Sequence, residues 1–241
     1  MKNFKKFKDD TICIICAKSK SQGLPNKNIR LINNYPLIYY AIKKAIKNKF
    51  KYICISTDSK KIAKIAKKYG LITFFTRSKK LCKPDVPKIE VWKDSIKRSE
   101  LHFKKKFSHM IDIEVTNPLI DEKDLFLFSK FFYKYYDNYD GSFCYRDAKK
   151  NPYFNLLERK KRGFVLSKNL KNFSINARQK APETYEHVAG LYYFNKNYIL
   201  NCSNILNGKT IGYYVSLFKS FDIDNLDDFK LVELLMKNKQ K

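Results

Sequence analysis

The chain has 241 residues, of which 44% are hydrophobic and 30% are charged. This content excludes a largely disordered protein, and the length allows one substantial hydrophobic core. Lysine and arginine number 50 against 23 acidic residues, and a formal net charge of +27 would suit a nucleic-acid binder. The lysines, however, recur on nearly every expected helix instead of gathering in one segment. We therefore expect neither nucleic acid nor a membrane as a partner, and we expect the positive field to steer small anionic substrates.

The cysteines and the start of the chain bear on the cellular compartment. Six cysteines are scattered along the sequence, and the only Cys-x-x-Cys pair is Cys13 and Cys16. On a strand these two side chains point to opposite faces, and no second pair completes a tetrahedral zinc site. The basic residues 1–10 precede an apolar run of six residues, 12–17, which is too short for a secretory signal or a membrane span. We expect a reduced, cytoplasmic protein.

The first 75 residues alternate between short apolar runs and amphipathic segments. Apolar residues at 37, 38, 41, 42, 45 and 46 have helical spacing, and Gly70 ends a second helical segment. The expected elements are a strand at 12–17, a helix at 36–50, a strand at 52–56, a helix at 60–69 and a strand at 71–75. This order predicts a parallel, right-handed α/β sheet.

The rest of the chain continues this pattern and adds a hairpin. Pro84 and Pro87 keep the segment 77–87 irregular. The expected elements after it are a helix at 88–107, a strand with its terminal loop at 109–119, a helix rich in Phe and Tyr at 121–136, a strand from 141 to 145, a hairpin at 154–167 with its turn at 160–163, and a helix at 225–236. No low-complexity linker divides these elements, which predicts a single domain over 1–241.

The loop 18–28 is the first candidate for chemistry. It follows the first apolar strand and contains three lysines, Lys18, Lys20 and Lys27, together with Gly23. In α/β proteins such a loop lies at the carboxyl edge of the sheet, where backbone N–H groups and lysines can hold phosphate. The loop can be a polyphosphate cradle, and the alternative is a solvated basic loop.

Two aspartates near the end of the chain are the second candidate. Asp222 and Asp224 alternate with Phe221 and Ile223, so that in an extended segment both carboxylates point the same way. Magnesium prefers one or two protein carboxylates completed by phosphate oxygens and waters. The pair can therefore hold Mg²⁺ against a nucleotide, and the alternative is that Asp224 caps the helix at 225–236.

The order of residues in the loop resembles a known signature. The acylneuraminate cytidylyltransferases, the CMP-sialic acid synthetase family, carry A-R-x-x-S-K-G-x-P-x-K-N, and residues 17–28 read A-K-S-K-S-Q-G-L-P-N-K-N. The agreeing positions are Ala17, Ser21, Gly23, Pro25, Lys27 and Asn28. Lys18 replaces an arginine and loses its bidentate fork, whereas Gln22 replaces a lysine and loses the charge. Either the grip on phosphate is weaker or Lys20 substitutes for the missing cation.

Three more segments resemble the same family in the same order. Arg77 and Leu81 match R-P-x-x-L-A-x-D, with Asp85 one position beyond the aspartate of that pattern, the segment 114–119 keeps part of the loop bordering the acceptor sugar, and Arg178, Gln179 and Pro182 match R-Q-x-x-P. The chain also has the family's S-x-D-I-D ending at 220–224. The resemblance implies that CTP is bound by Lys18, Lys20, Ser21, Gly23, Lys27, Asn28, Arg77 and Asp85. It implies that the sugar is bound by Glu114, Thr116, Arg178 and Gln179, and the metal by Asp222 and Asp224. Glu114 replaces a glutamine, and it can equally share an exposed strand end with Asp112.

The resemblance also implies a fold and a reaction. The fold would be a three-layer α/β, Rossmann-like fold with a mainly parallel sheet, of the nucleotide-diphospho-sugar transferase type, with a dimerisation arm at about 140–187 and a homodimeric assembly. The reaction would move CMP from CTP to the anomeric hydroxyl of a sialic, legionaminic or pseudaminic type of nonulosonic acid and release pyrophosphate. Lys18, Lys27, Asp222 and Asp224 would be the catalytic residues, with Mg²⁺ as cofactor.

Other functions and the proton acceptor stay open at this point. The alternatives are a CMP-Kdo-type synthetase and a divergent paralogue that binds nucleotide without turnover. A metal-bound water or Asp224 could take the hydroxyl proton. Every version of the enzyme hypothesis requires the cationic loop and the acidic pair to meet around one triphosphate.

Overall fold

The computed structural model describes residues 3–161, 163–168 and 178–238. Its centre is a six-stranded sheet in the order β10-β6-β9-β5-β1-β4. The strands are β1 (Thr11–Cys16), β4 (Ile53–Ser56), β5 (His109–Ile113), β6 (Gly141–Asp147), β9 (Tyr185–Asn195) and β10 (Thr210–Tyr214). Only β9 runs antiparallel to its neighbours among these strands. The predicted mainly parallel α/β sheet is confirmed.

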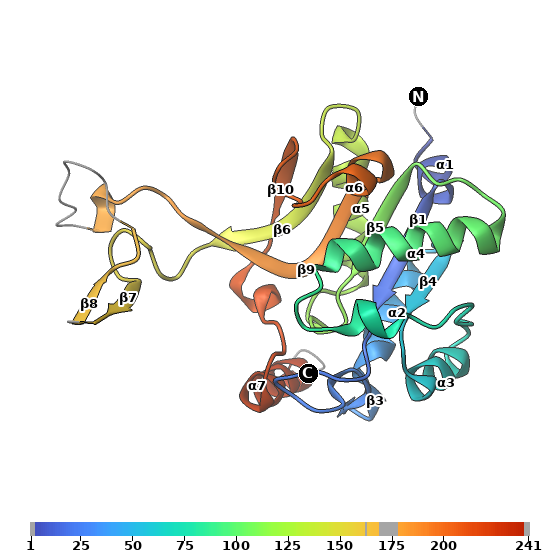
Figure 1. Ribbon diagram of the computed structural model, residues 1–241, viewed down its shortest axis with the longest axis horizontal. Coiled ribbons are helices and arrows are strands. Elements are labelled where there is room, and N and C mark those ends of the chain that lie inside the picture. The colour runs from blue at the N-terminus through green and yellow to red at the C-terminus, as the bar shows by residue number, and fades with distance from the viewer. Residues whose placement is uncertain (1–2, 162, 169–177, 239–241) are drawn as a thin grey trace.

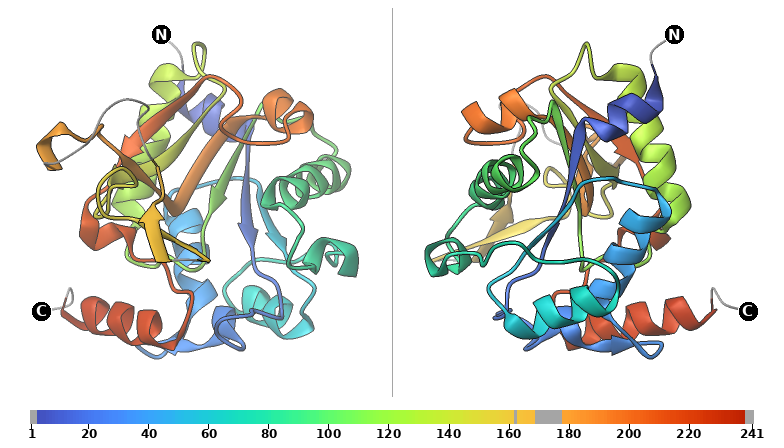
Figure 2. Two further views of the ribbon diagram at one scale, coloured as in Figure 1. Left: turned by 60° about the vertical axis from the view of Figure 1, so that its left-hand side comes forward. Right: turned by 90° about the vertical axis from the view of Figure 1, so that its right-hand side faces the viewer.

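Helices cover both faces of the sheet and complete three layers (Figures 1 and 2). They are α1 (Phe4–Asp9), α2 (Leu37–Lys47), α3 (Lys60–Lys68), α4 (Lys88–Phe103), α5 (Glu122–Tyr135), α6 (Lys196–Asn201) and α7 (Leu226–Asn238). Strand β1 shows how the sequence builds the layers. Ile12 and Ile14 are buried in a cluster with residues of α4 and α6, whereas Cys13 and Ile15 are buried in a cluster with residues of α2 and α5. An apolar run without alternation suits a strand that is covered on both faces.

The segment 71–75 is not a strand, contrary to the prediction. Its side chains find other partners: Phe74 stacks on His102 of α4 with 4.1 Å between ring centroids, and Ile72 is 73% exposed. Strand β4 therefore remains an edge of the sheet. The irregular segment after it contains only one short turn, η2 (Lys79–Cys82).

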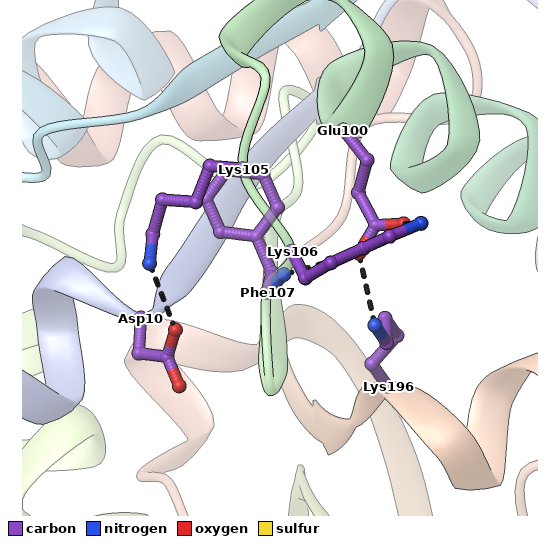
Figure 3. A network of polar contacts seen from close by, with 6 residues as sticks. All are labelled: Asp10, Glu100, Lys105, Lys106, Phe107 and Lys196. Atoms are coloured by element: carbon purple, nitrogen blue, oxygen red, sulfur yellow. Dashed lines mark hydrogen bonds and ion pairs between the residues drawn. The ribbon is translucent and has the colours of Figure 1, made fainter.

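Helix α4 ends at Phe103, four residues before the predicted end. Lys104 has a left-handed backbone with φ of 50°, and the following loop is held by the network in Figure 3. Glu100 accepts hydrogen bonds from the Phe107 amide at 3.0 Å and from Lys196 at 2.9 Å. Lys105 forms an ion pair with Asp10 at 3.0 Å. These contacts turn the chain from α4 into β5.

We expect Glu100→Gln to lower the free energy of unfolding by about 1.5–3 kcal/mol, the range for hydrogen bonds to a charged group. Burial alone would raise the pKa of Glu100, but the hydrogen bonds from Lys196 and Phe107 outweigh burial and lower this pKa. The stabilisation is therefore present above the pKa of the unfolded chain and is lost as pH falls through the folded value. Urea unfolding at pH 7 measures the effect. Glu90→Gln, which breaks the exposed pair with Lys93 on the same helix, is the control and should cost less than about 1 kcal/mol. Equal losses would contradict the prediction.

The predicted hairpin forms β7 (Leu157–Lys160) and β8 (Gly163–Leu166), which project away from the sheet (Figure 1). The strands on either side of the projection, β6 and β9, belong to the central sheet. Residues 162 and 169–177 of the predicted arm lie outside the described residues. Among the helices of the described part, none combines the length and apolarity of a membrane span.

Candidate active site

Three loops meet at the carboxyl edge of the sheet because β1, β4 and β5 are parallel neighbours. The loop after β1 is fastened at both ends. The Asn28 side-chain amide donates to the Lys18 carbonyl at 2.9 Å. The backbone N–H and the hydroxyl of Ser19 donate to Asp58, just after β4, at 2.7 and 2.5 Å. The loop therefore has a defined shape before any ligand binds.

The acidic segment near the end of the chain joins this loop. The Ile223 N–H donates to the Thr116 carbonyl at 3.0 Å, which places the segment against the loop after β5. Lys27 Nζ donates to the Ile223 carbonyl and lies 3.2 Å from Asp224 Oδ1. A Cβ built on Gly23 would lie 2.3 Å from the Asp224 carbonyl oxygen. The cationic loop and the acidic pair thus meet, as the enzyme hypothesis requires.

A cleft of about 480 Å³ opens between these segments. Most of the predicted ligand-binding residues line it: Lys18, Ser21, Gly23, Lys27, Asn28, Arg77, Glu114, Thr116 and Asp224. Gln22, at the position that lacks the family's lysine, lines it too. The cleft thus brings together residues from four distant parts of the sequence.

Besides Asp222, four predicted ligand-binding residues do not line this cleft. Lys20 and Asp85 are exposed and do not line it. Arg178 and Gln179 belong to the short turn η3 (Arg178–Lys180), which lies on the arm beyond β9 (Figure 1). These two residues therefore do not line the cleft of their own chain.

Asp222 does not line the cleft, and its carboxylate is largely buried. Burial raises the pKa of Asp222 to about 6, and the hydrogen bond from Thr116 opposes this rise. Asp222 Oδ1 is buried and has no hydrogen-bond partner among the described residues. Asp224 is not the cap of α7, contrary to one alternative, because the Asn225 side chain accepts from the N–H groups of Asp227 and Asp228. The Asp224 carboxylate is therefore not used to cap α7.

A divalent cation fits this pair. Within the described residues no group of three or more His, Cys, Asp and Glu side chains is arranged to hold a metal, so Asp222 and Asp224 are considered as a pair. Magnesium takes one or two carboxylates and fills its shell with phosphate oxygens and waters. The unpartnered Asp222 oxygen and the exposed Asp224 carboxylate suit that arrangement.

Comparison with known proteins decides the family. Residues 12–200 match the family model described as cytidylyltransferase. This chain belongs to the cytidylyltransferase family. It is 39% identical to the post-translational flagellin modification protein B of Campylobacter coli, over 95% of this chain and 96% of that protein. It is also 39% identical to the CMP-N,N'-diacetyllegionaminic acid synthase of Campylobacter jejuni, over 94% of this chain and 95% of that protein.

Solved structures show that the fold is that of the cytidylyltransferases. A CMP:2-keto-3-deoxy-manno-octonic acid synthetase complexed with CTP superposes with a TM-score of 0.67 and 13% identity, over 95% of this chain and 99% of that one. A cytidylyltransferase from Leptospira borgpetersenii superposes with a TM-score of 0.57 and 15% identity, over 96% and 95%. The predicted fold and the predicted nucleotidyltransferase class are confirmed.

Arg77 of this cytidylyltransferase has a rigid position at the cleft. It is only 4% exposed. Its Nε donates to the Ser56 hydroxyl at 3.0 Å, and its Nη2 donates to the Ser56 carbonyl at 2.5 Å. These bonds use part of the guanidinium and leave its remaining donors for a ligand.

Lys88 is a residue of the cytidylyltransferase cleft that the sequence prediction missed. Its ammonium donates to Asp112 Oδ2 at 2.5 Å and to Glu114 Oε1, and it lies over the rings of Trp92 and Tyr192 at 5.5 and 5.2 Å. Asp112 is fully buried. A lysine in the first turn of a helix opposes the helix dipole, and this is the sequence feature that could have pointed to a buried partner.

We expect Gly23→Ala to lower cytidylyltransferase turnover about a hundredfold, since small misplacements of reacting groups have effects of that size. The added Cβ would collide with the Asp224 backbone, so that the loop and the acidic segment must move apart. Steady-state kinetics with CTP measures the loss. Lys20→Ala, an exposed position of the same loop, is the control and should keep nearly full activity. A Gly23→Ala protein as active as the Lys20→Ala protein would contradict this geometry.

Proposed function

We propose that this cytidylyltransferase transfers CMP from CTP to the anomeric hydroxyl of a nonulosonic acid and releases pyrophosphate. The observation that carries the proposal is the contact between Lys27 and Asp224 at 3.2 Å, because it joins the cationic loop and the acidic segment at one cleft. The Campylobacter jejuni relative that is 39% identical, a CMP-N,N'-diacetyllegionaminic acid synthase, supports an acceptor of the legionaminic acid type. N,N'-diacetyllegionaminic acid is the first acceptor to test.

In the proposed complex the triphosphate lies between the loop 18–28 and the segment 222–224. Lys18 and Lys27 neutralise phosphate charge, and Arg77 holds the cytosine end. Glu114 and Thr116 border the acceptor on the other side. The sugar hydroxyl oxygen attacks the α-phosphorus, the bond from that phosphorus to pyrophosphate breaks, and the hydroxyl proton passes to solvent. Positioning and charge neutralisation supply most of the rate enhancement.

Mg²⁺ is the proposed cofactor, held by Asp222 and Asp224. When bound, it supplies positive charge against the phosphate oxygens. The unpartnered Asp222 oxygen supports this assignment. The acidic pair then contributes ligands, while Lys27 keeps Asp224 oriented toward the cleft.

The activity can be tested directly. The purified protein is incubated with CTP, Mg²⁺ and a panel of sugar acids of the legionaminic, sialic, pseudaminic and 3-deoxy-octulosonic types, and pyrophosphate release is followed. The proposal expects release with a nonulosonic acid. Turnover with only the 3-deoxy-octulosonic acid would favour the CMP-Kdo-type alternative, and CTP binding without turnover would favour a paralogue that only binds nucleotide.

We also propose a cytoplasmic homodimer. The six cysteines are free thiols, which suits a reducing compartment. The β7–β8 hairpin exposes apolar side chains, including Leu157 at 58% and Phe164 at 69%. A two-stranded hairpin is marginally stable alone in water, so a second copy is the proposed cover. In such a dimer Arg178, which lies on the arm, would serve the partner's cleft.

We expect a mixture of two inactive variants to regain activity if the arm serves the partner. Arg178→Ala and Asp222→Asn chains, unfolded and refolded together in equal amounts, should show about a quarter of wild-type turnover, because half of the dimers are mixed and each mixed dimer has one complete cleft. Sedimentation checks the dimer, and pyrophosphate release checks the activity. The two variants refolded separately are the controls. No recovery in a verified mixed dimer would place Arg178 in the cleft of its own chain, and full activity of Arg178→Ala refolded alone would place it outside both clefts.

A further inference from the structure

Fewer ammonium groups are available to a ligand in the cleft than the number of its lysines suggests. Lys18, Lys27, Lys83 and Lys88 all line it. Two of these ammonium groups are already committed: Lys27 to Asp224 and the Ile223 carbonyl, and Lys88 to Asp112 and Glu114. A triphosphate that enters the cleft must therefore compete with these carboxylates for the ammonium groups of Lys27 and Lys88.

Lys18 and Lys83 differ from the other pair. Neither ammonium forms an ion pair or a side-chain hydrogen bond within the described part of the chain. They also come from different walls, because Lys18 follows β1 whereas Lys83 follows η2. An anion between these walls can therefore be contacted by two uncommitted cations from two sides.

The backbone fixes where Lys83 stands. It is the first residue after η2, with φ of −63° and ψ of 151°, and the following Pro84 restricts it to this extended region. Leu81 and Val86, on either side of it, also line the cleft. Lys83 is thus presented from a short, proline-bounded loop, and only its side chain needs to be ordered when a ligand binds.

On the opposite wall, the uncharged Gln22 supplies no cation. This residue lines the same cleft and stands where the matching loop signature has lysine. Lys20, the other candidate for compensation, is exposed and does not line the cleft. We propose that Lys83 supplies the polyphosphate-binding cation that Gln22 does not, from the opposite wall. This inference deepens the proposed function and relies on it for the identity of the nucleotide.

Equilibrium binding of CTP, measured by calorimetry without an acceptor, tests the inference. Lys83→Ala should weaken CTP binding about tenfold, the size expected for one charge-assisted contact, and should leave cytidine binding unchanged. Lys79→Ala and Lys80→Ala, which change exposed lysines of the same turn, and Lys20→Ala should all bind CTP like the wild type. Gln22→Lys in the Lys83→Ala background should restore most of the lost affinity.

The readouts separate this inference from the proposed function. CTP binding that is equal in Lys83→Ala and Lys79→Ala overturns the inference, whether or not the wild type releases pyrophosphate. A tenfold loss with Lys20→Ala in place of Lys83→Ala overturns it as well, and so does an equal loss of CTP and cytidine affinity. Absence of pyrophosphate release by the wild type would refute the proposed function while leaving the Lys83 contact supported by the binding data.

Discussion

Replacing Asp222 by asparagine should nearly abolish turnover and at the same time stabilise the metal-free protein. The loss of turnover should reach about a thousandfold, because charge stabilisation by a bound metal is worth several kcal/mol and each 1.4 kcal/mol is a factor of ten. The gain in stability at pH 8 should be about 1–3 kcal/mol, since one pKa unit corresponds to about 1.4 kcal/mol. The buried Asp222 carboxylate has an oxygen without a partner among the described residues, and the neutral amide removes that cost.

The pH dependence gives the sign of this effect. The pKa of Asp222 is raised to about 6 by burial. Its stabilising contribution is therefore fully present below the unfolded value of about 4 and is lost as pH rises through 6. Wild-type protein without metal should gain stability from this group between pH 8 and pH 5, and Asp222→Asn should not. Thermal unfolding over this range, with and without MgCl₂ and CTP, measures both effects.

A nearby aspartate provides the control for this experiment. Asp227 is exposed in the first turn of α7, and Asp227→Asn should change neither turnover nor the response of the melting temperature to MgCl₂. Full turnover by Asp222→Asn would refute the metal assignment. A lower stability of the metal-free Asp222→Asn protein would show that the carboxylate is satisfied in a way that the structure does not indicate.

Lys88→Ala should have the largest effect on stability, a loss of about 3–5 kcal/mol at pH 8, as expected when one partner of a buried ion pair is removed. Burial alone would lower the pKa of Lys88, but Asp112 and Glu114 outweigh burial and raise it well above its usual value. The ammonium therefore stays charged between two carboxylates. Without it, Asp112 is a fully buried carboxylate with no cation.

Protonation should relieve part of this loss. Burial already raises the pKa of Asp112 to about 6, with Lys88 opposing the rise, so removal of Lys88 should raise it further. A raised carboxyl pKa destabilises the folded state at pH values above it, and the deficit of Lys88→Ala should be smaller at pH 5.5 than at pH 8. Urea unfolding at the two pH values measures the difference.

Two further variants show whether the buried charge is the cause. Adding Asp112→Asn to Lys88→Ala should recover much of the stability, because the amide needs no cation. Lys93→Ala, which breaks an exposed pair on the same helix, should cost less than about 1 kcal/mol. A Lys88→Ala protein that resembles Lys93→Ala at pH 8 would show that the triad of Lys88, Asp112 and Glu114 contributes little.

The spacing of apolar residues predicted helices and strands correctly where burial of these side chains was the main interaction. The helical spacing at 37–46 leads to α2 because burial of one apolar stripe stabilises an amphipathic helix. The unbroken apolar run at 12–15 leads to β1 because a strand that is covered on both faces buries all of these side chains. The prediction of a strand at 71–75 was wrong because the aromatic rings of this segment pack on α4 and its backbone does not pair with β4. A five-residue apolar segment does not contain the information that separates these outcomes.

The sequence by itself determined the chemistry of the site: a phosphate-type loop with Gly23 and Lys27 and an acidic pair at 222 and 224, each readable within a few residues. Only the tertiary structure decided which charges remain available in the cleft. Lys88 is neutralised by Asp112 and Glu114, Lys83 has no such partner among the described residues, and Lys20 does not line the cleft. The physical reason is that backbone periodicity and turn preferences act between neighbours in the chain, whereas ion pairing acts through space between segments that come together only when the sheet forms.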